Sequence, residues 1–416
     1  MLEKRVTGWT VIWKEGFMEW KTSWSYLPLN FDTTIGSLEN ITQRTTFWNN
    51  VNGEKVKVKF SNKYGTTPLK LKEAVIAQKE KDSSQIVKHT NLTVNQKEEI
   101  LILPGQEFYS DEVEFEVSAG TDIVLSIYYE ERNEIQSCCC VWAKESWHTE
   151  YLTGGNYTRK EKVETQKSFE VCPFIGTYMD QADILAGISE IRLLTENEVK
   201  TITLFGDSIT HMSFYADSLM EVLYHRFPGK VTILNKGIGG NKILTDSSFI
   251  LEIPGHGRCS GDAGLKRFEK DVFETEIPEY VFVLEGVNDI MHPYFLKRMD
   301  TLPKAQDLIA AYIAMADIAH QKGSNIYFST ILPLKHEKTP FGPEGEQIRI
   351  EVNEWLLAQK ESEGVFDFAG AVAKDKESMK EHLHTGDGLH PNKKGGTVMA
   401  PVVFQNGGID NGIITD

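Results

Sequence analysis

The sequence predicts an α/β protein with two domains, an N-terminal β-sandwich of jelly-roll type and a C-terminal three-layer domain built on a parallel sheet. Three observations lead to this prediction. At 416 residues the chain is too long for one typical domain. Up to about residue 195 it has the pattern of short strands and turns, and beyond that point strand patterns alternate with helical ones. We therefore expect domains at residues 1–195 and 196–416.

The strand signals of the first domain are short and are separated by turn residues. Residues 55–60 alternate strictly between lysine and apolar side chains and lead into the turn-forming residues 61–65. Similar signals occur at residues 99–103, 113–117 and 121–129. Because no convincing amphipathic helix interrupts them, a sandwich of two sheets is the best interpretation.

The second domain alternates apolar runs with helical patterns. The expected strands are residues 200–205, 231–235, 280–285, 325–331 and 364–368. Helical patterns include residues 303–322 and 344–360. This alternation is typical of a parallel sheet that is covered by helices on both faces. In such a sheet the ligand crevice lies at the carboxyl ends of the strands.

Residues able to do chemistry follow three of these strands. Ser208 stands in a Gly-Asp-Ser-Ile sequence directly after the first strand, where its hydroxyl would lie beside the free backbone N–H groups of a helix start. Gly240 belongs to a glycine-rich segment after the second strand, and glycine allows close approach of a backbone N–H to a ligand. Asn288 follows the third strand and can aim its amide N–H into the same crevice.

A carboxylate and an imidazole occur close together near the end of the chain. Asp387 precedes His390 by three residues, so it can accept a hydrogen bond from the ring N–H. That bond would fix the tautomer of His390 and leave its other nitrogen free to act as a base. Each of these short motifs, taken alone, is also compatible with an ordinary turn or helix cap.

In this order, the motifs around Ser208, Gly240, Asn288 and Asp387 to His390 resemble the four signature blocks of the SGNH (GDSL-type) hydrolases, over residues 198–400. The resemblance implies a flavodoxin-like sheet and a serine esterase. It assigns Ser208 as the nucleophile, His390 as the general base and Asp387 as the group that orients His390.

The same resemblance implies an oxyanion hole. Its donors would be the backbone N–H groups of Ser208 and Gly240 and the side-chain amide of Asn288. Asp207 and Asp289 would serve as structural supports in the turns.

The resemblance extends into the first domain. Gln43-Arg44 and residues 56–71, together with Arg267-Phe268 and Asp271, are similar to bacterial two-domain SGNH hydrolases that carry an N-terminal β-domain. Several SGNH enzymes with an accessory β-domain deacetylate polysaccharides. This chain departs from them in having no secretion signal at its start and no closing helix over residues 404–416.

Other site types are less well supported. His382, His384 and His390 with Asp387 match no familiar zinc spacing, and no cysteine accompanies them. The glycines at 237, 239 and 240 lack the later glycine of a dinucleotide fingerprint. The three consecutive cysteines, residues 138–140, are interpreted as free thiols. We therefore expect neither a metal nor a cofactor.

Charge and cysteine content narrow the expected partners and location. A formal net charge of −16 argues against a nucleic-acid partner or an anionic membrane surface. No apolar run approaches the length of a membrane span. An odd total of five cysteines, with no signal peptide, suits a reducing cytoplasm. The oligomeric state is not predicted.

These observations predict an esterase that cleaves short acyl groups, acetyl in particular, from a carbohydrate. Two alternatives remain open at this point. One is a lipase, lysophospholipase or thioesterase for longer chains, which would need an apolar groove. The other is a catalytically silent carbohydrate-binding protein, for which the tryptophans of the first domain would form a sugar platform, although core packing explains them equally simply.

Overall fold

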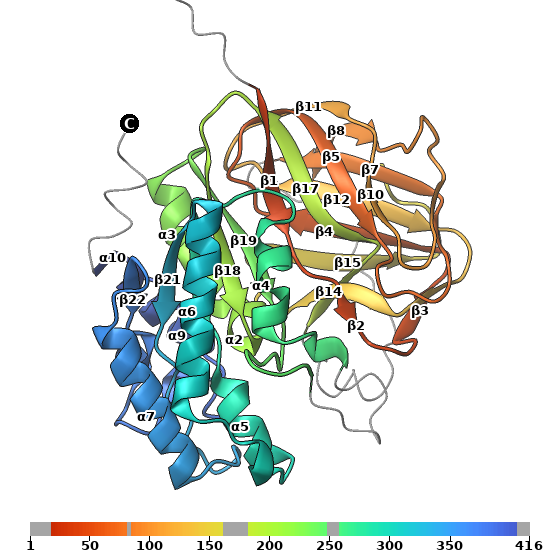
Figure 1. The fold of residues 1–416 in the computed structure, drawn as a ribbon. Coiled ribbons are helices and arrows are strands. Elements are labelled where there is room, and N and C mark those ends of the chain that lie inside the picture. The colour runs from red at the N-terminus through yellow and green to blue at the C-terminus, as the bar shows by residue number, and fades with distance from the viewer. Residues whose placement is uncertain (1–17, 81–84, 161–181, 248–257, 406–416) are drawn as a thin grey trace, which may run out of the picture.

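The computed structural model describes residues 18–80, 85–160, 182–247 and 258–405, and confirms the predicted fold class (Figure 1). A β-rich N-terminal part, drawn in red to yellow, stands beside a C-terminal part of parallel strands and helices, drawn in green to blue. The last strand of the sandwich, β17 (Ile188–Thr195), is followed directly by the first strand of the parallel sheet, β18 (Lys200–Gly206).

The N-terminal part contains two five-stranded antiparallel sheets. One consists of β1 (Glu19–Ser25), β17, β5 (Gly53–Ser61) and β10 (Glu107–Tyr109) in that order, with β11 (Val113–Val117) also paired to β5. The other consists of β15 (Trp147–Thr153), β4 (Ile41–Phe47), β12 (Ile123–Tyr129), β7 (Glu73–Lys79) and β8 (Ile86–Asn91).

Among the described residues, three smaller sheets complete the N-terminal part. The first pairs β3 (Gly36–Leu38) with β13 (Asn133–Ile135), and the second pairs β6 (Leu69–Leu71) with β9 (Ile100–Ile102). The third has the order β16 (Asp183–Ala186), β14 (Ser137–Val141) and β2 (Leu29–Asn30). Strand β14 carries the cysteine triplet and is buried along its whole length.

The two large sheets share one hydrophobic core, which explains the alternation seen in the sequence. On β5 the apolar residues Val56, Val58 and Phe60 are fully buried, while the lysines between them reach solvent. The polar pair on β4 is buried as well. The side chain of Gln43 hydrogen-bonds both main-chain groups of Ala186, and Arg44 donates to Ser126 and to the carbonyls of Tyr157 and Lys160. Such partners make polar burial tolerable inside a sandwich.

The C-terminal sheet is entirely parallel. Its strand order is β19 (Val231–Gly237), β18, β20 (Tyr280–Leu284), β21 (Asn325–Ser329) and β22 (Gly364–Phe366). This is the 2-1-3-4-5 order of flavodoxin-like folds, in which the chain reverses direction of winding at the first strand. The carboxyl end of β18 is therefore the expected ligand crevice, and Ser208 follows it.

Helices surround this sheet and complete three layers (Figure 1). They are α2 (Ser208–His211), α3 (Phe214–Arg226), α4 (Gly264–Phe273), α5 (Val287–Phe295), α6 (Ala305–Lys322), α7 (Pro343–Ala358), α8 (Phe368–Val372), α9 (Lys393–Met399) and α10 (Val402–Gln405). Helices α6 and α7 match the two predicted segments within a few residues. The short helix α10 includes Phe404, where a polar tail was expected, and residues 406–416 lie outside the described part.

The two parts of the chain meet through buried hydrogen bonds. The Asn50 side chain donates to the carbonyls of Phe227 and Val231 and accepts from the N–H of Gly229. Asp217 on α3 accepts the N–H groups of Glu145 and Ser146 from the sandwich side. Because these partners are main-chain groups, the hydrogen bonds fix the distance between the two domains as well as the orientation of the side chains.

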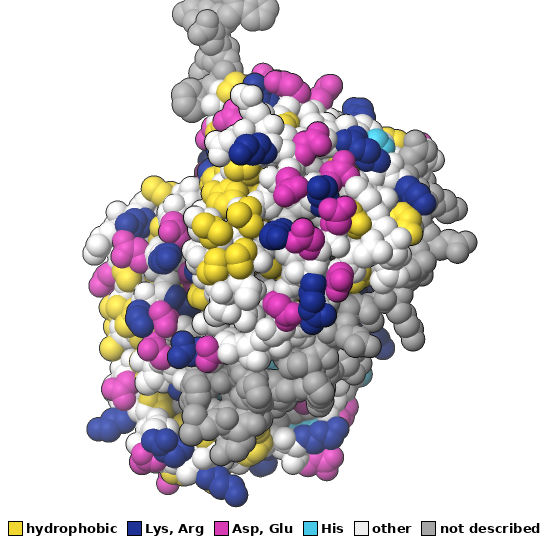
Figure 2. Space-filling view, turned by 90° about the vertical axis from the view of Figure 1, so that its right-hand side faces the viewer, with side chains coloured by type: hydrophobic (Ala, Val, Ile, Leu, Met, Phe, Trp, Pro, Cys, Tyr) yellow, Lys and Arg dark blue, Asp and Glu magenta, His cyan; other side chains and the backbone are white. Residues whose placement is uncertain are grey.

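The surface of the sandwich is mixed in charge. Figure 2 shows basic and acidic side chains next to one another over the described part of this face, with an apolar area beside them at the upper left. In the part of the chain that the structure describes, no helix is long and apolar enough to cross a membrane.

Replacement of Asn50 by alanine is expected to lower the free energy of unfolding by about 2 kcal/mol or more, because three buried hydrogen bonds between the domains are lost. Thermal and denaturant unfolding measure this change. Gln347→Ala, at an exposed position on α7, is the control and should stay within about 0.5 kcal/mol. Equal stabilities of the two variants would contradict a role for Asn50 in joining the domains.

Candidate active site

The structure brings Ser208, His390 and Asp387 into hydrogen-bonding distance. The Nε2 atom of His390 lies 2.8 Å from the Ser208 hydroxyl, although the two residues are 182 positions apart. The Nδ1 atom of His390 lies 2.6 Å from Oδ2 of Asp387. Ser208 is the first residue of α2, directly after β18, and the other two residues lie in the loop that precedes α9. The arrangement is that of a nucleophile, a base and an orienting carboxylate.

Asp387 is held as a carboxylate. Burial opposes its ionisation, but hydrogen bonding and the charge of His390 outweigh burial and hold the pKa of Asp387 well below its usual range. Its Oδ1 atom also accepts the N–H groups of Leu389 and His390. Asp387 therefore accepts the Nδ1 proton of His390, and Nε2 is left as the acceptor for the Ser208 hydroxyl proton.

Asp207 supports the turn that presents Ser208. It is the N-cap of α2, and its Oδ1 atom accepts the N–H of Ile209 at 2.9 Å. Burial raises the pKa of Asp207 to about 7, and its Oδ2 atom has no hydrogen-bond partner among the described residues. The side chain acts on the backbone of the nucleophile turn rather than on a ligand.

The candidate oxyanion donors come from three neighbouring loops. Within the described residues, no hydrogen-bond acceptor is found for the backbone N–H of Ser208 or of Gly240. Gly240 has a φ of +76°, and a Cβ there would lie 2.6 Å from Oγ of Ser260, so only glycine fits. The neighbouring Gly239 lies beside the nucleophile, since a Cβ there would be 3.9 Å from that of Ser208.

Asn288 is the third candidate donor. It is the second residue of α5, is 2% exposed, and donates one amide hydrogen to the carbonyl of Asn241 at 2.9 Å. That bond fixes the plane of the amide and leaves its second hydrogen for another acceptor. The adjacent Asp289 accepts the N–H groups of Ile243 and Leu244, and so ties this helix to the loop after Gly240. Burial raises the pKa of Asp289 to about 6.

Arg267 organises the site, although the sequence indicated it only through the family resemblance. Its guanidinium is buried and donates to the carbonyls of Gly206 and Lys236, the ends of β18 and β19. It also donates to Oδ1 of Asn241 at 2.7 Å. One side chain on α4 thus links two strand ends to the loop that orients Asn288. No local signal marks its role, because its partners in these bonds lie 26, 31 and 61 positions away.

A buried carboxyl group, Glu285, was not predicted. It lies at the end of β20 and is 1% exposed, with Arg267 at 3.9 Å. Neither carboxyl oxygen has a hydrogen-bond partner among the described residues. Burial raises the pKa of Glu285 to about 8, even though the charge of Arg267 acts in the opposite direction. Glu285 is therefore mostly protonated at neutral pH.

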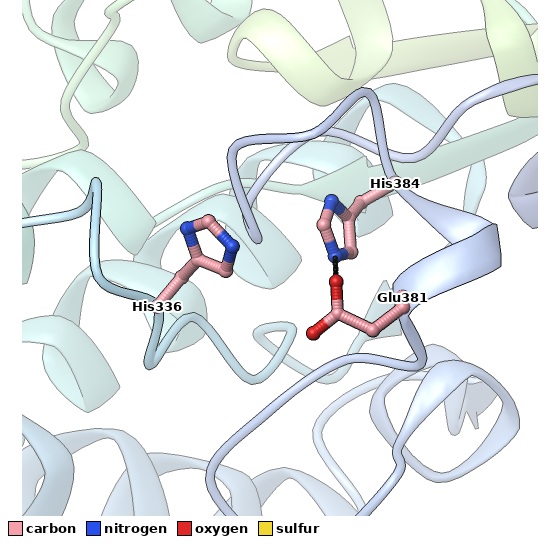
Figure 3. A group of neighbouring side chains, drawn as sticks. All are labelled: His336, Glu381 and His384. Atoms are coloured by element: carbon pink, nitrogen blue, oxygen red, sulfur yellow. Dashed lines mark ion pairs between the residues drawn. The ribbon is translucent and has the colours of Figure 1, made fainter.

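The histidines considered for a metal site do not form one group. His390 bonds Ser208 and Asp387, and His382 is exposed. His384 instead lies near His336 and Glu381, and Figure 3 shows the three side chains facing one another. Their ligand atoms all lie within 4.8 Å of one another. This second grouping involves a residue, His336, that the sequence did not connect with the others.

Hydrogen bonds identify the tautomer of His384 and indicate what this group does. Its Nδ1 atom accepts the N–H groups of Gly386 and Gly388, so the ring proton of the neutral form is on Nε2. A metal on Nε2 would require a proton on Nδ1, where two N–H groups already point. These hydrogen bonds therefore indicate that His384 supports the loop around Asp387. His336 packs against the same loop, since a Cβ on Gly388 would lie 2.2 Å from that of His336.

The tryptophans are mostly used for packing. Trp24 and Trp147 are buried and pack on each other in the sandwich core. Trp48 packs against Tyr224 of the C-terminal domain. Trp142 is half-buried and contacts His211, three residues after Ser208. The expectation for Trp9 and Trp13 lies outside the described residues.

Residues 204–398 match the model of the GDSL-like lipase/acylhydrolase family. The matched segment contains Ser208, Gly240, Asn288, Asp387 and His390. The C-terminal half of the chain is thus a GDSL-like lipase/acylhydrolase domain, of the SGNH type predicted from its motifs, and it follows a β-rich N-terminal region. No curated protein matches the chain.

Several solved structures are similar to this chain. The acetylxylan esterase Axe2 from Geobacillus stearothermophilus is 19% identical, and the match covers 50% of this chain and 93% of Axe2 with a TM-score of 0.39. An α/β hydrolase from the metagenome of Lake Arreo is 18% identical, with coverages of 50% and 94% and a TM-score of 0.39. A GDSL-like lipase from Bacteroides thetaiotaomicron is 16% identical, with coverages of 49% and 85% and a TM-score of 0.36. At such identities these proteins assign no substrate to this chain.

Protonation of Glu285 predicts how stability depends on pH. Because its pKa in the fold, about 8, is above the ordinary value of 4.5, Glu285 contributes stability below pH 4.5 that is lost as the pH rises toward 8. In the wild type this lowers the free energy of unfolding on the order of a few kcal/mol between pH 5 and pH 8, and Glu285→Gln should remove this dependence. Denaturant unfolding at several pH values measures the slope. A slope equal to that of the wild type would contradict a buried, proton-binding Glu285.

Two substitutions of His384 separate its acceptor role from simple packing. Asparagine places an oxygen near the position of Nδ1, whereas glutamine places one near Nε2. We expect His384→Asn to keep most of the ester-hydrolysis rate and His384→Gln to lower kcat about tenfold, because the loop carrying Asp387 shifts. The exposed His382→Gln is the control. A rate for His384→Gln equal to that for His384→Asn would contradict the acceptor role.

Proposed function

We propose that the protein is a serine esterase that removes short acyl groups, acetyl in particular, from a carbohydrate. The observation that carries the serine mechanism is the hydrogen-bonded chain from Ser208 through His390 to Asp387, at 2.8 and 2.6 Å. The family of the C-terminal domain supports an esterase or acylhydrolase. The length of the acyl group and the identity of the alcohol are the more specific parts of the proposal.

In the proposed reaction, Ser208 Oγ attacks the ester carbonyl carbon while Nε2 of His390 takes the hydroxyl proton. The oxygen of the tetrahedral intermediate is bound by the N–H groups of Ser208 and Gly240 and by the Asn288 amide. His390 then gives its proton to the leaving alcohol as the C–O bond breaks. Water attacks the acyl-enzyme, His390 takes a proton from it, and the acid leaves as the proton returns to Ser208.

The surroundings of Gly240 support a small acyl group and a polar alcohol. The nearest described groups beyond its own loop are the Ser260 hydroxyl and the His292 ring, the latter at 3.8 Å from the position of a Cβ. Both are polar, whereas a long acyl chain needs an extended apolar groove. Hydroxyl and imidazole groups can hydrogen-bond the hydroxyls of a sugar. The lipase and thioesterase alternatives gain no support from these neighbours.

The silent binding protein is the second candidate class. Its tryptophan platform is weakened because Trp24 and Trp147 are buried in the core. A binding module would also have no need for a serine, a histidine and a carboxylate in hydrogen-bonding order. The esterase is therefore the better explanation of the site.

The proposed location is the cytoplasm. Cys138, Cys139 and Cys140 are free and buried. Burial raises the pKa of the three buried thiols, which makes them unreactive. Free thiols suit a reducing compartment.

Acetate release from acetylated oligosaccharides, together with a chain-length series of nitrophenyl esters, tests the proposal. We expect Ser208→Ala and His390→Ala to lower kcat by about 10⁴-fold or more with an almost unchanged thermal transition. The exposed His382→Ala, eight residues before His390, is the matched control and should keep its rate. Normal turnover in the Ser208 and His390 variants would refute the mechanism. A preference for long chains would refute the acetyl assignment.

A further inference from the structure

A second histidine lies close to the candidate nucleophile and takes no part in the proposed reaction. His211 is the last residue of α2, three residues after Ser208, and is 1% exposed. Its main chain is packed against the end of β19, since a Cβ on Gly237 would lie 2.4 Å from the backbone nitrogen of His211. A polar ring buried this deeply requires partners for both nitrogens.

The two ring nitrogens of His211 have partners in different domains. Nδ1 accepts the N–H of Gly239 at 3.1 Å, in the loop that carries the candidate oxyanion donor Gly240. Nε2 lies 3.5 Å from the sulfur of Cys140, on strand β14 of the sandwich. The half-buried Trp142 contacts the same ring edge-on, with centroids 5.5 Å apart. The imidazole thus lies between the sandwich and the oxyanion loop.

The proton of His211 can be assigned from these contacts. An N–H group points at Nδ1, so Nδ1 carries no proton and the neutral ring has its hydrogen on Nε2, directed at Cys140. Burial lowers the pKa of His211 to about 4, so the ring is neutral at physiological pH. It is therefore an acceptor on the side of the catalytic domain and a donor on the side of the sandwich.

The backbone between the domains is joined at the same place. The N–H of Ala143, just after β14, donates to the carbonyl of Met212 at 2.9 Å, directly after α2. This bond joins the chain just after strand β14 to the end of the helix that starts at Ser208. The contacts of this strand constrain both the helix and the ring that holds Gly239.

We infer that His211 is a positioning residue through which strand β14 of the sandwich holds the Gly239-Gly240 loop in the geometry of the oxyanion hole. This inference rests on the proposed esterase function. It assigns the N-terminal domain a part in catalysis, because the acceptor that orients His211 comes from Cys140. Loss of the support would raise the barrier of the chemical step without removing any group that touches the substrate.

Substitutions of His211 test the acceptor. Asparagine places its oxygen near the position of Nδ1, glutamine places its oxygen near that of Nε2, and leucine removes both. We expect kcat for nitrophenyl acetate to fall about tenfold to a hundredfold in His211→Gln and His211→Leu, with KM within about twofold, because the loop donor is misplaced by a fraction of an ångström to about 1 Å. His211→Asn should stay within about fivefold of the wild type.

A pair of cysteine variants tests the contribution of the sandwich. Cys138 and Cys140 are both fully buried on β14 and are two residues apart, so their side chains point to the same side of the strand. We expect Cys140→Ala to lower kcat about fivefold or more, since the Nε2 donor loses its sulfur acceptor, and Cys138→Ala to leave it within about twofold. Thermal unfolding of each variant checks that it is folded.

A substrate-independent readout separates this inference from the proposed function. The rate at which a fluorophosphonate labels Ser208, followed by intact mass with Ser208→Ala as the blank, also depends on the oxyanion hole. An unlabelled wild type that hydrolyses no ester would refute the esterase proposal and this inference with it. A labelled wild type with an unchanged rate in His211→Gln, or with His211→Asn as slow as His211→Leu, would refute the inference alone. So would equal kcat values for Cys140→Ala and Cys138→Ala.

Discussion

The candidate site depends on one buried cation. Arg267 lies behind the strand ends and donates to the carbonyl of Gly206, at the end of β18, and to Lys236 and Asn241, which flank the loop that carries Gly240. The first of these segments leads to Ser208, and the second contains the candidate oxyanion donor Gly240. Moving a guanidinium out of water is costly, and these acceptors, together with the carboxylate of Asp271 at 3.2 Å, offset the cost. One side chain consequently ties the ends of the two strands to each other.

The acidic groups of the site fall into two kinds, those whose pKa is raised and one whose pKa is depressed. Asp207, Glu285 and Asp289 are buried, and desolvation raises their pKa values. Asp387 is also partly buried, yet its pKa is depressed because His390 and two backbone N–H groups stabilise the charge. Of these four described carboxyl groups, Asp387 is the one hydrogen-bonded to an imidazole, so it is placed to stabilise the protonated form of His390. Similar side chains therefore take different roles according to their hydrogen bonds.

The loop that carries Asp387 is held by contacts within it and from a neighbouring loop. His384 accepts two of its N–H groups, Lys338 donates to the carbonyl of Gly386, and Thr339 donates to that of Asp387. Main-chain bonds of this kind fix the loop before any substrate arrives. Preorganisation of this type lowers the reorganisation that a catalytic step requires.

The sequence alone was enough for the fold class and for the short-range part of the site. Strand and helix periods are local, and Asp387 lies three residues from His390, so both follow from neighbouring residues. Only the tertiary structure decided which distant residues support them. Arg267 reaches Gly206 across 61 positions, and His211 meets Cys140 across 71. No periodic pattern encodes such contacts, because they arise where strand order and domain docking bring separate segments to one edge of the sheet.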